Sequence, residues 1–155
     1  MLSDSAITIR PATSAEIPAI INLQRQTPTS AHWTQDQYEG FFSSKAPRRL
    51  VLVAESPRTE FVGFLVARHI PPDWELENIV VAANSHRSGV GQRLLTVLLE
   101  TAKQCNSEAV FLEVRESNVA ARSLYEKVGF RQTGSRKSYY QQPLEDAILY
   151  RRNLH

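Results

Sequence analysis

The sequence predicts a single domain of the α/β type, in the looser α+β arrangement, in which a mixed central sheet is flanked by helices. Three observations carry this prediction. The 155 residues, of which 42% are hydrophobic, are enough to build one core. Short β-rich runs alternate with segments of helical periodicity, and a glycine-containing turn joins one strand to an amphipathic helix. We therefore treat residues 1–155 as one domain.

The first half of the chain contains two pairs of residues typical of helix starts. Thr13 with Glu16, and Thr34 with Gln37, have the spacing of a capping box, and each pair precedes apolar residues at helical spacing. The second helix falls within the segment 27–45. We expect this segment to form a lid.

Seven runs have the composition of strands, and two of them are joined by a short hairpin turn at Pro57-Arg58-Thr59. The first five are residues 7–10, 50–54, 61–66, 76–81 and 109–114, and two more lie between 132 and 153 around the turn 141–144. The hairpin spacing predicts antiparallel pairing of the second and third runs.

Two amphipathic helices are expected in the second half of the chain. The first follows the glycine turn and carries an apolar stripe made by Leu94, Leu95, Leu98, Leu99 and Ala102. The second begins at a capping Asn118 and ends at Gly129, which is expected to be left-handed.

Composition and charge exclude several classes of protein. Eighteen basic and sixteen acidic residues give a net charge of +2, which is neither the signature of disorder nor that of a nucleic-acid binder. Cys105 is the only cysteine, so a disulfide within the chain is impossible, and the four histidines lack metal-ligand spacing. The first residues do not resemble a secretion signal, and no apolar run is long enough to span a bilayer. We expect a cytoplasmic monomer or weak homodimer without a metal, a membrane partner or a nucleic-acid partner.

The run His86-Arg87-Ser88-Gly89-Val90-Gly91-Gln92 lies where a strand ends and a helix begins. Unpaired backbone amides and the helix dipole favour an anion there, and Arg87 adds positive charge. A P-loop would need a Lys-Ser/Thr pair after the second glycine, and a dinucleotide fingerprint would need glycine where Leu94 stands. A phosphate-binding turn and a turn without any ligand are both compatible with these residues.

The order of antiparallel strands, glycine turn, amphipathic helix, strand and capped helix resembles the GNAT superfamily of N-acetyltransferases over nearly the whole chain. The resemblance implies a GNAT-type acyl-CoA N-acyltransferase fold that uses acetyl-CoA. It also implies that the 76–81 strand splays from its neighbour, so that its backbone pairs with the pantetheine arm. His86 stands where the family motif has Gln or Arg. The implied coenzyme-binding residues are Ile79, Val80, Val81, Arg87, Ser88, Gly89, Val90, Gly91, Gln92 and Asn118.

The segments 112–118 and 124–130 are similar to the narrower group of RimI-type N-terminal acetyltransferases. That resemblance implies Glu113 as general base, Tyr125 as general acid, and a protein α-amine as acceptor, with ribosomal protein S18 as the bacterial example. The roles make chemical sense because the amine must lose a proton and the departing thiolate benefits from a proton donor. An α-amine, with a pKa of about 7.7–8.0, demands less of the base than lysine at about 10.4.

Alternatives stay open for these residues. Glu113 could form a surface ion pair beside Arg115, and Tyr125 could be an ordinary core aromatic. Glu75 and Glu77 share one face of their strand and are rival bases.

The acceptor and the overall role also stay open. Of the adjacent Tyr139 and Tyr140, at most one is expected to face an acceptor groove, because neighbours on a strand point to opposite sides. A small-molecule amine is the alternative acceptor, and a non-catalytic acyl-CoA-binding module is the alternative function.

Overall fold

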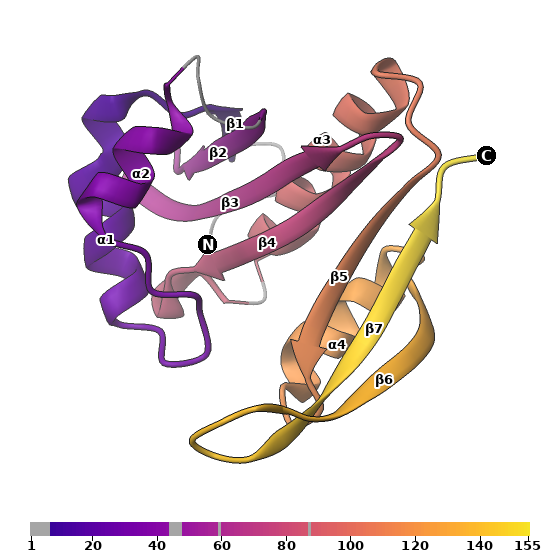
Figure 1. The fold of residues 1–155 in the computed structure, drawn as a ribbon. Coiled ribbons are helices and arrows are strands. Elements are labelled where there is room, and N and C mark those ends of the chain that lie inside the picture. The colour runs from indigo at the N-terminus through magenta and orange to yellow at the C-terminus, as the bar shows by residue number, and fades with distance from the viewer. Residues whose placement is uncertain (1–6, 44–47, 59, 87) are drawn as a thin grey trace.

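A computed structural model describes residues 7–43, 48–58, 60–86 and 88–155 (Figure 1). These residues form the following elements in chain order: β1 (Thr8–Pro11), η2 (Ser14–Glu16), α1 (Ile17–Arg25), α2 (Gln35–Phe41), β2 (Arg49–Glu55), β3 (Phe61–Ile70), β4 (Asp73–Val81), η3 (Ala83–Ser85), α3 (Val90–Gln104), β5 (Ala109–Arg115), α4 (Val119–Lys127), β6 (Arg131–Tyr140) and β7 (Glu145–Asn153). The η elements are short 3-10 helices. Every strand and helix expected from the sequence is present.

All seven strands belong to one mixed sheet, as predicted, in the order β1-β2-β3-β4-β5-β7-β6 (Figure 1). Strands β1 to β4 pair antiparallel with their neighbours in chain order, whereas β4 and β5 run parallel. The last strand, β7, lies between β5 and β6 and is antiparallel to both. A parallel β4–β5 neighbour pair requires a crossover connection, which α3 provides.

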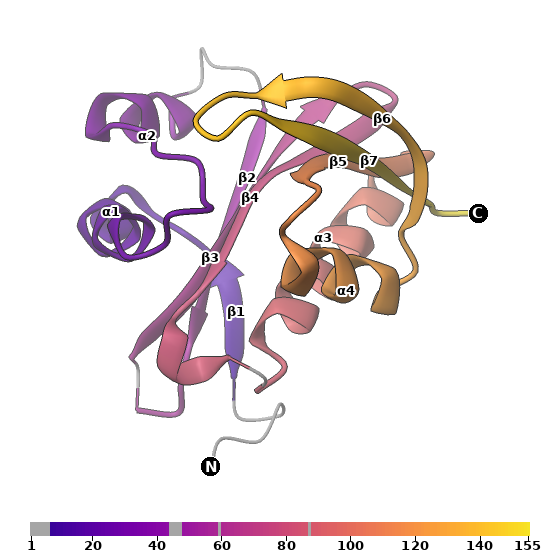
Figure 2. The same ribbon diagram turned by 90° about the horizontal axis from the view of Figure 1, so that it is seen from below.

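The helices cover both faces of the sheet. Helices α1 and α2 lie on one face, and α3 and α4 lie on the other (Figure 2). Each face has its own hydrophobic core, and the α3 stripe predicted from Leu94 to Ala102 is buried in the larger one. The burial of apolar side chains on both faces is the main stabilising contribution to this three-layer arrangement.

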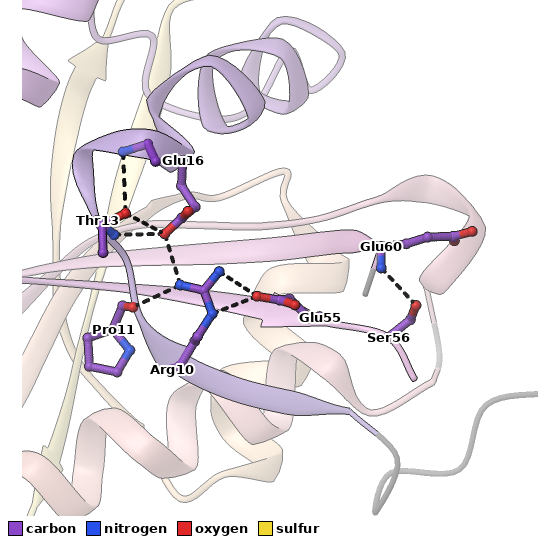
Figure 3. Close-up of polar contacts among 8 residues, drawn as sticks. Arg10, Pro11, Thr13, Glu16, Glu55, Ser56 and Glu60 are labelled. Atoms are coloured by element: carbon purple, nitrogen blue, oxygen red, sulfur yellow. Dashed lines mark hydrogen bonds and ion pairs between the residues drawn. The ribbon is translucent and has the colours of Figure 1, made fainter. Parts of the chain in front are cut away.

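The first capping box is confirmed, and an ion-pair cluster surrounds it (Figure 3). The Thr13 side chain accepts a hydrogen bond from a backbone amide, and its own backbone amide donates to Glu16 Oε1 at 2.7 Å. Arg10 in β1 contacts the same carboxylate at 2.9 Å and also Glu55 of β2, with Nε 2.6 Å from Oε1. The second capping box, at Thr34, is confirmed as well.

Strands β3 and β4 extend beyond the predicted ranges 61–66 and 76–81. Their pairing continues to Ile70 opposite Asp73, so that Pro71-Pro72 forms the two-residue turn of a hairpin. At a turn the missing proline amides break no hydrogen bond of the sheet.

Strands β4 and β5 are paired at only one end. The pairs are Trp74 with Val110 and Glu75 with Phe111, and from there the strands diverge (Figure 1). This geometry agrees with the splayed strand that the family resemblance implies, and it opens the sheet near its middle.

Within the ranges that the structure describes, no helix is both long enough and apolar enough to cross a bilayer.

Candidate active site

A cavity of about 290 Å³ lies where β4 and β5 diverge. Four segments contribute its walls: the loop before α2, the middle of β4, the end of β5 and α4 with its cap, with one residue of β6. The lining residues are Pro28, Thr29, Ser30, Ala31, Leu76, Glu77, Asn78, Ile79, Glu113, Val114, Arg115, Asn118, Ala121, Tyr125 and Tyr140. The cavity therefore contains both predicted catalytic residues and two of the predicted coenzyme-binding residues.

A bulge in β4 at Glu77 changes which side chains face the cavity. Before it, Leu76 belongs to the core under α3. After it, Val80 belongs to the core under α1, whereas Ile79 and Val81 pack against the core under α3. An extra residue shifts the alternation of a strand by one position, which explains the exchange of faces.

The backbone of β4 divides its hydrogen-bonding groups between β3 and the opening. The Ala82 amide donates to the Val62 carbonyl at 2.8 Å, and opposed residues of an antiparallel pair alternate between bonded and non-bonded positions. Val80 is therefore in a hydrogen-bonded position, and its backbone amide and carbonyl both pair with β3. The amides and carbonyls of Ile79 and Val81 point away from β3, toward the space between β4 and β5.

The glycine turn has the geometry expected of an anion-binding helix start. Gly89 has φ 83°, which favours glycine, and no side chain caps α3, which begins at Val90. A Cβ on Gly91 would lie 2.9 Å from Leu124 Cδ2, so this glycine permits close packing of α3 on α4. The first-turn amides, including that of Gln92, have no partner within the helix.

The residues just before that turn are held by short contacts. The His86 ring, through Nε2, lies 2.9 Å from the Val81 carbonyl oxygen, and the Ser88 hydroxyl donates to the Ser85 carbonyl. His86 is thus occupied with the end of β4. Arg87, a predicted phosphate ligand, lies outside the described residues.

Glu113 lies on β5, inside the sheet, and its carboxylate is in an ion pair. Arg136 of β6 approaches it with NH2 3.3 Å from Oε1, and the Arg136 side chain is 55% exposed. Arg115, the neighbour expected beside Glu113, instead pairs with Glu145 at 3.3 Å and stacks on the Tyr140 ring at 4.3 Å.

Tyr125 is a core aromatic that also borders the cavity. Its side chain is 6% exposed, and its ring packs near Phe130 and Tyr150, with centroid distances of 5.9 and 6.2 Å. Burial raises the pKa of its hydroxyl above the ordinary value, and the nearby Tyr140 adds to the effect. The hydroxyl forms no hydrogen bond with the part of the chain that the structure describes.

The two rival carboxylates differ in position. Glu77 lines the cavity, but both its oxygens face Arg49, at 2.8 Å from Nε and 3.2 Å from NH2, and Arg49 also stacks on Phe41 at 4.1 Å. Glu75 does not line the cavity. Burial raises its pKa, and the neighbouring carboxylate of Glu77 raises it further.

Asn118 and the adjacent tyrosines also have defined places. Asn118 caps α4 as predicted, with Oδ1 accepting from the Ala121 amide at 3.2 Å. Only Tyr140 of the tyrosine pair lines the cavity. The rings of Tyr139 and Tyr140 contact each other edge to face at 5.1 Å, so they do not point to opposite sides. The strand is irregular there, because Ser138 has φ 55°.

Sequence reasoning missed the loop wall of the cavity. The segment 27–45 was expected to be a lid; its residues 28–31 form a wall of the cavity beside β4, and its residues 44–47 lie outside the described ranges. Thr27 and Ser30, which hydrogen-bond back to the end of α1, were the local indication of an ordered turn.

Within the described residues, no group of three or more His, Cys, Asp or Glu side chains is arranged to hold a metal ion.

Comparisons with known proteins agree with the geometry. The model of the Acetyltransferase (GNAT) family matches residues 17–130. The chain is 30% identical over 144 residues to the [ribosomal protein bS18]-alanine N-acetyltransferase of Salmonella typhimurium, covering 92% of this chain and 94% of that protein. Other matches are shorter. The chain is 41% identical over 93 residues to an uncharacterized protein of Mycobacterium leprae and covers 25% of that protein. It is 37% identical over 84 residues to the [ribosomal protein bS18]-alanine N-acetyltransferase of Haemophilus influenzae and covers 57% of it. The chain thus spans only part of the length of these two relatives.

Solved structures give the same result. The crystal structure of the ribosomal-protein-S18-alanine N-acetyltransferase from Escherichia coli superposes with a TM-score of 0.82 and 25% identity, covering 96% of this chain and 94% of that one. The fold, with its cavity where β4 and β5 diverge, is thus that of the acyl-CoA N-acyltransferase class. The chain belongs to the acetyltransferase (GNAT) family, whose members transfer the acetyl group of acetyl-CoA to amines.

Proposed function

We propose that this protein transfers the acetyl group of acetyl-CoA to the α-amine at a protein N-terminus, with Glu113 as general base and Tyr125 as general acid. The observation that carries the proposal is that these two side chains, from opposite sides of the sheet, border one cavity at the divergence of β4 and β5. A direct transfer needs a base on the amine side and a proton donor on the thiolate side, with the reacting carbon between them.

Glu113 is the best-placed base among the carboxylates near the cavity. Its contact with Arg136 uses one oxygen at 3.3 Å from an exposed guanidinium, which water and an incoming amine can displace. The oxygens of Glu77 are both engaged by Arg49. Glu75 does not line the cavity. Glu113 therefore accepts the proton that the amine loses as it attacks the thioester carbonyl.

Tyr125 keeps its proton throughout the working pH range, because burial raises its pKa. A coenzyme A thiolate is a weaker base, with a thiol pKa of about 8.5. Complete transfer from Tyr125 is therefore uphill. Its main contribution is a hydrogen bond that strengthens as the carbon–sulfur bond breaks and charge develops on sulfur.

The coenzyme would extend along β4 from the cavity to the glycine turn. The pantetheine arm carries amides, which suit the outward backbone groups of Ile79 and the amide of Val81, since the Val81 carbonyl already contacts His86, whereas Val80 contributes only packing. The pyrophosphate suits the amides of Gly89 and the first turn of α3, whereas the Ser88 amide already donates to the Ser85 carbonyl at 3.3 Å; Asn118 borders the cavity end.

The acceptor assignment is supported by the relatives. Those that align along most of their length are named as alanine N-acetyltransferases of ribosomal protein bS18. A ribosomal protein N-terminus is accordingly the first acceptor to test.

The test is thiol release from acetyl-CoA by the purified protein, offered paired peptides that differ only in a free or a blocked N-terminus. The panel includes the N-terminal sequence of a bacterial S18, and polyamines and aminoglycosides serve as small-amine comparisons. Turnover with free peptides and none with blocked ones is the expected result. Turnover with small amines alone would reject the acceptor, and tight acetyl-CoA binding without turnover of any amine would reject the enzymatic role.

A further inference from the structure

The loop wall of the cavity is attached to the core by a chain of buried polar side chains. Gln24 is the one polar residue among the buried residues of α1 and is 3% exposed. Its Nε2 donates to the Trp33 carbonyl at 2.6 Å, and its Oε1 accepts from the Tyr38 hydroxyl at 2.6 Å. Each end of the Gln24 amide is therefore used, one on the loop and one on α2.

The chain of contacts continues from Tyr38 into β4. Tyr38 is fully buried, and the Asn78 side chain interacts with its hydroxyl. The Nδ2 atom of Asn78 also donates to the Ala31 carbonyl at 3.4 Å. Three buried side chains thus connect two points of one loop, the carbonyls of Ala31 and Trp33.

Further contacts fix the same loop from outside this connection. The Ser30 hydroxyl lies 2.9 Å from the Thr27 carbonyl and 3.3 Å from the Gln24 carbonyl. The Trp33 ring packs edge to face on Tyr38 and Phe41, at 5.7 and 5.1 Å. The loop is thus tied to α1, to α2 and to β4.

We infer that Gln24, Tyr38 and Asn78 are positioning residues that hold residues 28–31 as the wall against which the acceptor's first residues pack. The inference rests on the proposed function, since it assigns this part of the cavity to the acceptor. The wall lies across the cavity from Glu113 of β5, and its attachment point Asn78 adjoins Glu77 and Ile79 of β4. The polar groups of these buried side chains are one another's hydrogen-bond partners. Removing one therefore leaves another buried without a partner and weakens the attachment of residues 28–31 to the core.

Two of the three residues allow a clean test because Gln24 and Tyr38 do not line the cavity themselves. Tyr38→Phe keeps the ring and removes only the hydroxyl, and Gln24→Met keeps the length of the side chain. Each variant is expected to raise the KM for the acceptor peptide about 10-fold, the factor that corresponds to one hydrogen bond of roughly 1.4 kcal/mol. The KM for acetyl-CoA stays unchanged, because the glycine turn is untouched.

The matched control is Thr13→Ala, which removes the cap at the other end of the same helical segment. It lowers the melting temperature without changing the acceptor KM. If Thr13→Ala raised the acceptor KM as much as Tyr38→Phe does, general destabilisation would explain the effect and the inference would be wrong.

A second readout does not depend on the identity of the acceptor. Amide hydrogen exchange of residues 27–34 should be faster in Tyr38→Phe than in the unaltered protein, with the exchange of α3 unchanged. Unchanged exchange together with an unchanged acceptor KM would overturn the inference. Absence of peptide turnover in the unaltered protein would instead reject the proposed acceptor, and the exchange measurement would still decide on the wall.

Discussion

Replacing Glu113 and Glu77 separately by glutamine should separate loss of activity from loss of stability. In Glu113→Gln the partner left behind is Arg136, which is 55% exposed and can be solvated by water. Exposed ion pairs contribute about 0–1 kcal/mol, and each kcal/mol shifts the melting temperature of a chain this long by about 2–4 °C. The melting temperature should therefore fall by less than about 4 °C. Loss of a general base should lower kcat by about 10² to 10⁴-fold.

Glu77→Gln should have the opposite profile. The partner of Glu77 is Arg49, whose side chain is only 13% exposed. Arg49 contacts both carboxylate oxygens, and the substitution replaces that charged pair of acceptors by a neutral amide with a single acceptor oxygen. An incompletely paired charge in a partly buried position costs about 1–3 kcal/mol, which corresponds to a fall of about 2–12 °C. Turnover by the folded fraction should stay near that of the unaltered protein.

The assay combines thermal melts with thiol release at saturating acetyl-CoA and varied peptide. The two variants are matched, since each replaces one cavity-lining glutamate by its neutral isostere. A stable and active Glu113→Gln beside a stable but inactive Glu77→Gln would refute the assignment of the base and place it on β4. Glu75→Gln is the third variant to include in that event.

Three further predictions follow from burial and backbone geometry. Tyr125→Phe should lower kcat about 10²-fold with little change in melting temperature, because the hydroxyl has no hydrogen-bond partner among the described residues; an unchanged kcat would remove Tyr125 from the mechanism. Burial raises the pKa of both Tyr38 and Tyr125 above about 10, so the folded chain holds these protons more tightly than the unfolded chain. The contribution of these two groups to the free energy of unfolding, measured in urea, should thus be independent of pH below pH 10 and should fall as the pH rises above 10. The fall with pH should be smaller in Tyr38→Phe, which lacks one of the two hydroxyls. Gly129→Ala should lower the melting temperature by about 2–8 °C, because Gly129 has φ 97° and a Cβ there would lie 2.8 Å from Arg152 Nε; a calorimetric scan checks it, and an unchanged melting temperature would contradict the strain.

Local features of the structure were predictable from the sequence because they depend on neighbouring residues. The caps at Thr13, Thr34 and Asn118 need only a side chain and the amides two or three positions later. The left-handed Gly129 likewise follows from helix termination alone. The family resemblance then supplied the splayed strand and the joint presence of Glu113 and Tyr125.

Other features depend on contacts between distant segments and were not predictable. Nothing near Arg49 indicates that it pairs with Glu77, 28 positions away, although this contact engages both oxygens of that carboxylate. No sequence pattern indicates the bulge at Glu77 either, although the bulge determines on which side of the sheet the Ile79 side chain lies. The same holds for Gln24. From the sequence alone a glutamine in a helix is expected to be exposed to solvent, and only its contacts with Trp33 and Tyr38 explain its burial.

The separation of β4 from β5 gives the molecule an internal strand edge. Exposed edges on the outside of a sheet invite pairing with other chains, which proteins usually prevent. Here the edge is bordered by residues 28–31 on one side and by α4 on the other, and its outward amides and carbonyls suit a narrow ligand that carries spaced amides. The same backbone can serve relatives whose acceptors differ, because pairing with backbone groups requires no particular side chain at Ile79 or Val81.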